Sequence, residues 1–216
     1  ASDNHRHRAC RTVVLIPDCL IAGALGYEQA ACHAADGYSR TTGRTGVVIA
    51  TSGPGATNLI TGIATAYMDS IPMVALTGQV ATKLIGKDAF QEVDITGATL
   101  PFTKHSYLIK DGLDIPRVVN EAFHIANTGR PGPVLIDFPM DLLKKEFDYP
   151  DEDEDVNIRG YKLMGKANES QVKKVAEAIK GAKKPVILAG GGVVISDATN
   201  EFRKFVKETD IPVVST

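Results

Sequence analysis

The sequence lacks several features that would define a class of protein. It contains no tryptophan, and its three cysteines have no Cys-x-x-Cys spacing. No apolar run approaches the roughly 18 residues that a membrane-spanning helix needs. A disulfide framework, a zinc knuckle and a membrane helix are therefore not indicated. The formal net charge of -2 gives no surplus of basic residues for nucleic acid or an anionic membrane surface.

Common nucleotide-binding and hydrolase motifs are also absent. No GxxxxGK[ST], GxSxG or HExxH pattern occurs. The stretch "AGGGVV" at 189–194 lacks the GxGxxG spacing, and a tight turn explains it better than a dinucleotide site. The composition is 44% apolar and 23% charged, as in soluble globular proteins. Because no secretory signal is visible, we expect a cytoplasmic, bacterial-type location rather than an organelle.

Short β-branched runs alternate with longer segments of helical period from residue 12 onward. The pattern predicts strands at 11–16, 46–52, 72–78, 105–110 and 133–139, and helices at 27–41, 55–70 and 115–129. Several strands are apolar on both faces, which is typical of a parallel sheet covered by helices on both sides. We therefore expect an α/β fold with a doubly wound, mostly parallel sheet.

The composition changes at 144–168, where an acidic run and a proline interrupt this alternation. We interpret the segment as a linker between domains. The alternation then resumes, with helices at 169–184 and 198–210 and strands at 185–191 and 211–216. These elements are too few to close a sheet, so we expect a truncated second α/β unit.

A carboxylate heads a stripe of small residues in the first predicted helix. Glu28, Ala31, Cys32 and Ala35 share one helical face, and small side chains allow a backbone or a flat ligand to approach. A desolvated carboxylate there would hold its proton more tightly and could exchange it near neutral pH. Stabilisation of the helix N-terminus is an equally good interpretation.

The turn "TSGPGATN" at 51–58 follows a strand and precedes a helix, at the sheet edge where doubly wound folds bind ligands. Gly53 and Gly55 permit close backbone approach, and Asn58 offers both a donor and an acceptor. An ordinary strand–helix turn uses the same residues, so the turn alone does not distinguish the two.

Four longer stretches together resemble one family. They are "YEQAACHAADGYSRTTGRTGVVIATSGPGATNLITGIATAYMDSIPMVALTGQV", "GKDAFQEVDITG", "FTKHSYLI" and "GRPGPVLIDFPMDL". The chain is similar to the acetolactate synthase (acetohydroxyacid synthase) family of thiamine-diphosphate enzymes from about Tyr27 to Leu142. Residues 169–216 resemble the beginning of that family's central domain.

The resemblance implies a domain order. Residues 1–26 are a divergent N-terminal segment, 27–143 a pyrimidine-binding domain, 144–168 a linker and 169–216 the start of an FAD-associated central domain. The implied reaction is decarboxylation of pyruvate and condensation with a second 2-keto acid, in branched-chain amino acid biosynthesis or an acetoin pathway. The family domain that holds Mg²⁺ and the diphosphate has no counterpart in this sequence, so we expect the chain alone to be inactive.

The resemblance also implies roles at the cofactor. Glu28 corresponds to the glutamate that activates thiamine diphosphate through N1′ of its aminopyrimidine. Pro54, Gly55 and Asn58 match the loop beside that ring.

Three further residues match positions nearer the substrate or a second cofactor. Phe90 and Gln91 match the substrate channel, and Gln91 is also expected to be catalytic. Arg130 in "GRPGP" matches an arginine that contacts FAD, which the family holds as a structural cofactor. The family implies a homodimer or higher homo-oligomer, a possible regulatory subunit, and neither nucleic acid nor membrane as partners. The alternative is a truncated, non-catalytic homologue that acts as a scaffold or interaction module.

Overall fold

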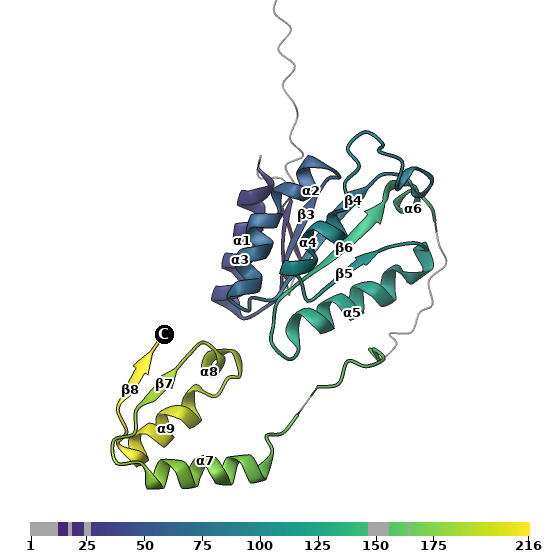
Figure 1. Cartoon of the computed structure of the whole chain (residues 1–216). Helices are drawn as coiled ribbons and strands as arrows, with labels where there is room; N and C mark the ends of the chain where they lie inside the picture. Colours follow the sequence, from purple (N-terminus) through teal and green to yellow (C-terminus); the bar gives the residue numbers. More distant parts are fainter. Residues whose placement is uncertain (1–12, 17–18, 24–26, 147–155, 164) are drawn as a thin grey trace, which may run out of the picture. The chain divides into compact units, whose positions relative to one another are not determined.

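The computed structural model describes residues 13–16, 19–23, 27–146, 156–163 and 165–216 (Figure 1). They form two compact units that divide between Leu163 and Met164. Within these ranges, no helix has both the length and the apolar character required to cross a bilayer.

The first unit contains a six-stranded sheet. Its strands are β1 (Val13–Ile16), β2 (Cys19–Gly23), β3 (Gly46–Ala50), β4 (Met73–Gln79), β5 (His105–Leu108) and β6 (Pro133–Pro139). Their spatial order is β1-β2-β3-β4-β6-β5. The β1–β2 pair is antiparallel and every other neighbouring pair is parallel. The carboxyl ends of β3, β4 and β6 therefore meet at one edge, where ligands bind in folds of this kind.

Helices cover both faces of this sheet. They are α1 (Glu28–Thr42), α2 (Pro54–Asn58), α3 (Ile60–Met68), α4 (Ile95–Thr99), α5 (Ile115–Asn127) and α6 (Met140–Leu143), with short 3-10 turns at Thr82–Leu84, Leu100–Phe102 and Gly112–Asp114. Figure 1 shows α1 and α3 side by side over one part of the sheet and α5 along another. The predicted doubly wound, mostly parallel α/β fold is confirmed.

Two hydrophobic cores follow from the alternation of side chains along the strands. Val48 and Ala75 face α1, α3 and α4, whereas their neighbours Val47 and Val74 face α5. Buried residues occupy both faces of β3, β4 and β6. This double burial explains why these strands were recognisable as apolar runs.

Several elements differ from the sequence prediction. The helix expected at 55–70 is two helices, because the Leu59 N–H bonds the Ala56 carbonyl three residues back and interrupts the regular pattern. Strand β2 and helix α4 were not predicted. Helix α4 is only five residues long and begins where the Asp94 carboxylate accepts a hydrogen bond from the Gly97 N–H.

The second unit contains a two-stranded parallel sheet. Its elements are α7 (Glu169–Gly181), β7 (Ile187–Ala189), α8 (Gly192–Ile195), α9 (Thr199–Thr209) and β8 (Val213–Ser215). Asn168 caps α7, since its side chain accepts hydrogen bonds from the N–H groups of Ser170 and Gln171. The "AGGGVV" stretch forms the turn from β7 into α8.

The segment predicted as a linker lies partly outside the described residues. Its described part, 156–163, packs on the first unit through Ile158 and Tyr161. The Tyr161 hydroxyl donates to the Thr128 carbonyl at 3.1 Å. This part of the segment is therefore anchored by side-chain contacts.

Candidate functional site

Glu28 and Asn58 form a hydrogen-bonded pair, although 30 positions separate them. Glu28 is the first residue of α1 and Asn58 is the last residue of α2. The Asn58 Nδ2 donates to Glu28 Oε2 at 3.1 Å. The amide binds one carboxylate oxygen and so favours one orientation of the carboxylate.

The other oxygen of Glu28 lies beside a glycine. A Cβ at Gly55 would lie 3.4 Å from Glu28 Oε1 and 2.6 Å from Thr51 Cγ2. The missing side chain therefore lets the backbone of α2 lie close to the acid. Pro54 is at the first turn of α2, a position that suits proline because no intrahelical bond needs its N–H.

Gln91 reaches the same turn from a different part of the chain. It has a left-handed φ of 59°, and Gly53 has a φ of 62°. A Cβ at Gly53 would lie 2.7 Å from the Gln91 carbonyl oxygen and 2.9 Å from its Cα. The backbone of Gln91 thus packs directly on Gly53, two residues before Gly55.

Phe90 lies beside Gln91 and is 89% exposed. No described residue covers its ring, so the segment that carries Gln91 also presents a large apolar side chain to its surroundings. The structure therefore brings Glu28, Gly55, Asn58 and Gln91 to one edge of the sheet, with Phe90 next to them.

The small-residue stripe of α1 has a different role from the one expected. Ala31, Cys32 and Ala35 are completely buried in the core. A Cβ at Gly62 of α3 would lie 2.4 Å from Cys32 Sγ, so the stripe accommodates helix α3 and no ligand. Burial, and then the charge of Asp36, raises the pKa of the Cys32 thiol to about 12.

The position of Glu28 also corrects the expectation of a fully desolvated acid. Its side chain is half-buried rather than enclosed. Glu28 shares the helix with Ala31, Cys32 and Ala35, but only those three small residues enter the core.

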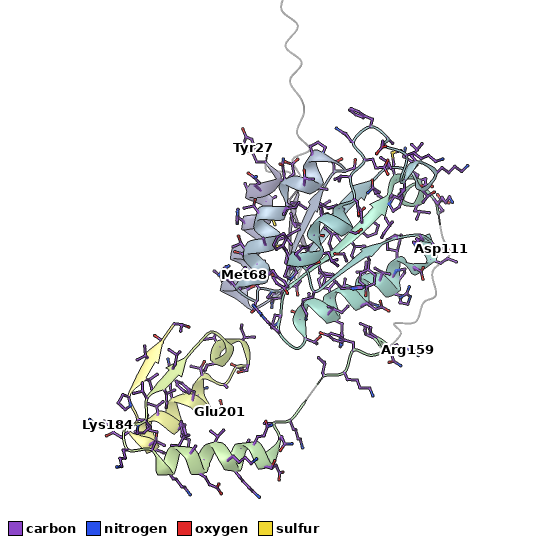
Figure 2. All side chains as sticks on the ribbon, viewed as in Figure 1. Tyr27, Met68, Asp111, Arg159, Lys184 and Glu201 are labelled. Carbon is purple, nitrogen blue, oxygen red and sulfur yellow. The ribbon has the colours of Figure 1, made fainter. Side chains whose placement is uncertain are left out.

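Arg130 lies away from this site. Its Nε donates to Ser70 Oγ at 2.7 Å, and its Nη2 donates to the Met68 carbonyl at 3.1 Å, so the guanidinium caps the carboxyl end of α3. Figure 2 shows Met68 and Tyr27, the neighbour of Glu28, at opposite ends of the first unit. The sequence-predicted site residues thus separate into a Glu28 group and a distant Arg130.

Sequence reasoning missed a buried polar network at the Glu28 edge. Asp137 Oδ1 accepts a hydrogen bond from Thr77 Oγ1 at 2.7 Å, and its Oδ2 accepts one from Gln79 Nε2 at 2.9 Å. Burial raises the pKa of the Asp137 carboxyl to about 6, although the bonds from Thr77 and Gln79 oppose that shift. The available signal was the appearance of Asp and Gln inside strands that are otherwise apolar on both faces.

The Glu28 group suits a flat nitrogen heterocycle. A fixed carboxylate can accept a hydrogen bond from a ring N–H, or hold a proton for a ring nitrogen. The glycines at 53 and 55 do not themselves leave space for a ligand, as the turn had suggested: the missing side chain of Gly53 admits the Gln91 backbone, and that of Gly55 admits Thr51 and the Glu28 carboxylate. An aminopyrimidine has the shape and the hydrogen-bonding groups that this arrangement requires.

Comparison with known proteins identifies both units. Residues 26–98 match the N-terminal TPP binding domain of thiamine pyrophosphate enzymes, and residues 172–216 match the central domain of these enzymes. The chain is 53% identical over 193 residues to the acetolactate synthase large subunit of Buchnera aphidicola subsp. Acyrthosiphon pisum, covering 88% of this chain and 33% of the relative.

Two relatives from other lineages give the same result. An acetolactate synthase of Mycobacterium bovis is 54% identical over 192 residues, with 88% of this chain and 31% of the relative covered. A probable acetolactate synthase large subunit of Methanocaldococcus jannaschii is 53% identical over 193 residues, with 88% and 32% covered. The chain spans about a third of the length of these relatives.

Proposed function

The chain belongs to the thiamine pyrophosphate enzymes, and we propose that it is part of an acetolactate synthase large subunit. The proposed reaction is the decarboxylation of pyruvate and the transfer of the resulting two-carbon unit to a second 2-keto acid. The names and the identity of the three relatives support this assignment. No observation favours the alternative of a non-catalytic scaffold.

The observation that carries the proposal is the hydrogen-bonded Glu28–Asn58 pair beside Gly55. When bound, thiamine diphosphate supplies the nucleophilic carbon and the electron sink for decarboxylation. Glu28 holds a proton at the aminopyrimidine ring nitrogen. Asn58 holds Oε2 of the Glu28 carboxylate and leaves Oε1 for the ring nitrogen of a bound cofactor, and Gly55 lets α2 approach the acid closely.

Gln91 and Phe90 form the substrate side of the proposed site. Gln91 offers an amide donor and acceptor to the keto acid, and the exposed ring of Phe90 offers it an apolar contact. Pro54, at the start of α2, would border the aminopyrimidine side of the site together with Gly55 and Asn58. The proposed substrates are pyruvate and a second 2-keto acid. The proposed protein partners are further copies of the same subunit, in a homodimer or larger oligomer, and a regulatory subunit.

The proposal also includes Mg²⁺ and a structural FAD. Mg²⁺ is usually held through one or two carboxylates together with phosphate oxygens, so it belongs with the diphosphate end of the cofactor. For FAD, the chain offers Arg130, which is exposed and has N–H groups beyond those that cap α3. In a full-length synthase, Arg130→Ala should weaken FAD binding about ten- to a hundredfold, as loss of a charge-assisted contact implies. Flavin fluorescence titration measures this, and equal affinity would remove Arg130 from the FAD site.

The test of the proposed function is Glu28→Gln in a full-length synthase that contains this segment. The amide keeps the size of the side chain and loses the acid, so proton exchange at thiazolium C2 should slow at least about 10²-fold while cofactor affinity changes little. Quenched hydrogen–deuterium exchange followed by NMR measures that rate.

Glu169→Gln is the matched control. Glu169 is likewise the first residue of a helix, α7, so its replacement removes an acid from a helix N-terminus and leaves every residue of the Glu28 group unchanged. Wild-type C2 exchange in Glu28→Gln, or an equal loss in Glu169→Gln, would reject the role assigned to Glu28.

A further inference from the structure

The segment that carries Gln91 needs an anchor. It leaves the end of β4 at Gln79 and returns at Val93, just before α4. Gln91 adopts a left-handed backbone, which is strained for a residue other than glycine. Its position against Gly53 therefore depends on contacts that hold the segment.

The side chain of Gln79 joins both ends of this segment. Its Nε2 donates to the Val93 carbonyl at 2.8 Å, and its Oε1 accepts from the Val80 N–H at 2.8 Å. Gln79 is only 6% exposed, so water competes poorly for these bonds. One amide thus closes the base of the loop at Val80 and Val93.

Asp137 fixes which way that amide points. Both hydrogens of Gln79 Nε2 have acceptors, one at Val93 and the other at Asp137 Oδ2. Turning the amide over would place its oxygen against the carboxylate, so the charge selects a single orientation. Asp137 is 1% exposed, and its second oxygen is held by Thr77, its register partner across the strands.

The carboxylate is not needed to join the strands. Strands β4 and β6 already pair over seven register positions, from Met73↔Pro133 to Gln79↔Pro139. A buried charge costs free energy that a well-packed apolar pair avoids. Hydrogen bonds to an ionised acceptor are also roughly twice as strong as neutral ones. A carboxylate at position 137 therefore binds the Gln79 amide more strongly than a neutral acceptor would.

We propose that Gln79, oriented by the buried carboxylate of Asp137, is a positioning residue that keeps Gln91 against Gly53 beside Glu28. The placement of the segment stands on the hydrogen bonds alone. Its relevance to catalysis rests on the proposed function, in which Gln91 faces the keto acid.

Amide hydrogen exchange by mass spectrometry on the 216-residue chain tests the placement. Gln79→Met keeps an unbranched side chain and removes all three hydrogen bonds. Peptides that cover 80–93 should exchange at least about tenfold faster, as loss of a hydrogen bond with a buried partner implies. If Gln79→Met does not fold, Gln79→Ala carries the same expectation, because it removes the same three hydrogen bonds and adds neither bulk nor charge.

Ser39→Ala is the matched control for a general loss of stability. Ser39 is also a buried hydrogen-bonding residue, but its hydroxyl bonds the Pro72 carbonyl and the Gly46 N–H at the opposite edge of the sheet. It should leave 80–93 at wild-type exchange. Unchanged exchange of 80–93 in the Gln79 variant, or an equal increase in all peptides of the first unit, would overturn the proposal.

Asp137→Asn separates positioning from mere structural support. The neutral amide can still bond Gln79 and Thr77, so 80–93 should exchange only about two- to fivefold faster, as a weaker acceptor implies. The same variant should resist urea better at neutral pH, because it removes a buried charge. Local protection and global stability then move in opposite directions, whereas a purely structural role would move them together and refute the proposal.

Turnover in the full-length synthase tests the catalytic meaning. Gln79→Met should lower kcat for pyruvate about tenfold or more with a smaller change in cofactor affinity, since a displaced group near the reacting atoms costs rate. Faster exchange of 80–93 with wild-type kcat would overturn the positioning role in catalysis. Full activity of Glu28→Gln would instead reject the proposed function and leave the exchange result standing.

Discussion

Asp137→Asn should make the first unit more stable at neutral pH. In the folded protein, burial raises the pKa of Asp137 from its ordinary value of 3.8 to about 6. Between these two values the folded chain binds a proton that the unfolded chain has released. The free energy of unfolding therefore falls as the pH rises through this window. The stability that the bound proton contributes is lost completely above the folded pKa.

The magnitude follows from the size of the shift. A rise of about two pKa units corresponds to about 3 kcal/mol, at 1.36 kcal/mol per unit. Asp137 is 1% exposed, so solvent screening does not reduce this value much. Asparagine has no ionised form in this range and keeps hydrogen bonds to Thr77 and Gln79. The stability of Asp137→Asn relative to wild type should thus increase by about 3 kcal/mol between about pH 4 and about pH 7.

Urea unfolding followed by tyrosine fluorescence is the assay. The chain has no tryptophan, and all six tyrosines lie at or before position 161, so the signal reports on the first unit. Measuring wild type and Asp137→Asn in parallel at each pH cancels the titration of the groups that they share. A stability difference that does not change with pH would refute the assignment of a buried, charged Asp137.

Asp141→Asn provides a control of opposite sign. The Thr82 hydroxyl, and then the Thr82 N–H, lower the pKa of the Asp141 carboxyl. A carboxyl whose pKa is lowered on folding stabilises the folded state at pH values above its ordinary pKa. This stabilisation is lost as the pH falls through the folded pKa. Asp141→Asn should therefore lose stability at neutral pH, although both acids lie near the same edge of the sheet.

Two further predictions concern neighbouring contacts. Asn58→Asp would replace the amide donor with a second carboxylate about 3.1 Å from Glu28 Oε2, so repulsion would displace the Glu28 carboxylate. Pyruvate turnover of the full-length synthase should fall about tenfold or more, and wild-type turnover would contradict this. Gly62→Ala would force a Cβ against Cys32 and should destabilise the first unit by about 1–3 kcal/mol in urea. Gly37 also lies in a helix, α1, but has open space around it, so Gly37→Ala should stabilise the first unit by up to about 1 kcal/mol. Equal effects of Gly62→Ala and Gly37→Ala would exclude the steric contact proposed between position 62 and Cys32.

The elements that were predictable from the sequence are those whose pattern is local. Strand β6 was predicted with its observed bounds, because "PVLIDFP" is a short apolar run between turn residues. The 51–58 turn was placed at the carboxyl edge of the sheet from the order of strands and helices. The hydrogen bond between Asn58 and Glu28 was not predicted, because β2, the strand that precedes α1, was not recognised.

The elements that could not be predicted depend on pairing over long distances in the sequence. Gln79 and Asp137 are 58 positions apart, and only the parallel register of β4 with β6 brings them together. The burial of the α1 stripe against Gly62 likewise depends on which helix packs beside α1. A small-residue stripe predicts close approach, but its sequence does not say whether a helix or a ligand approaches.

The energetically costly features of the first unit gather at the Glu28 edge. Two of the three non-glycine residues with left-handed φ among its described residues, Asp88 and Gln91, lie in the 80–93 segment, and Gly53 and the buried Asp137 lie next to it. Strain and buried charge persist only where surrounding contacts determine the conformation. Here Gln79 closes the base of the segment, Glu92 binds the N–H groups of Gly86 and Ala89 within it, and Asp141 binds Thr82. Selection for stability alone would favour an amide at position 137 and a glycine at position 91. That the chain keeps a carboxylate and a glutamine at these positions is the outcome expected if the geometry of this edge, rather than its stability, is what the protein requires.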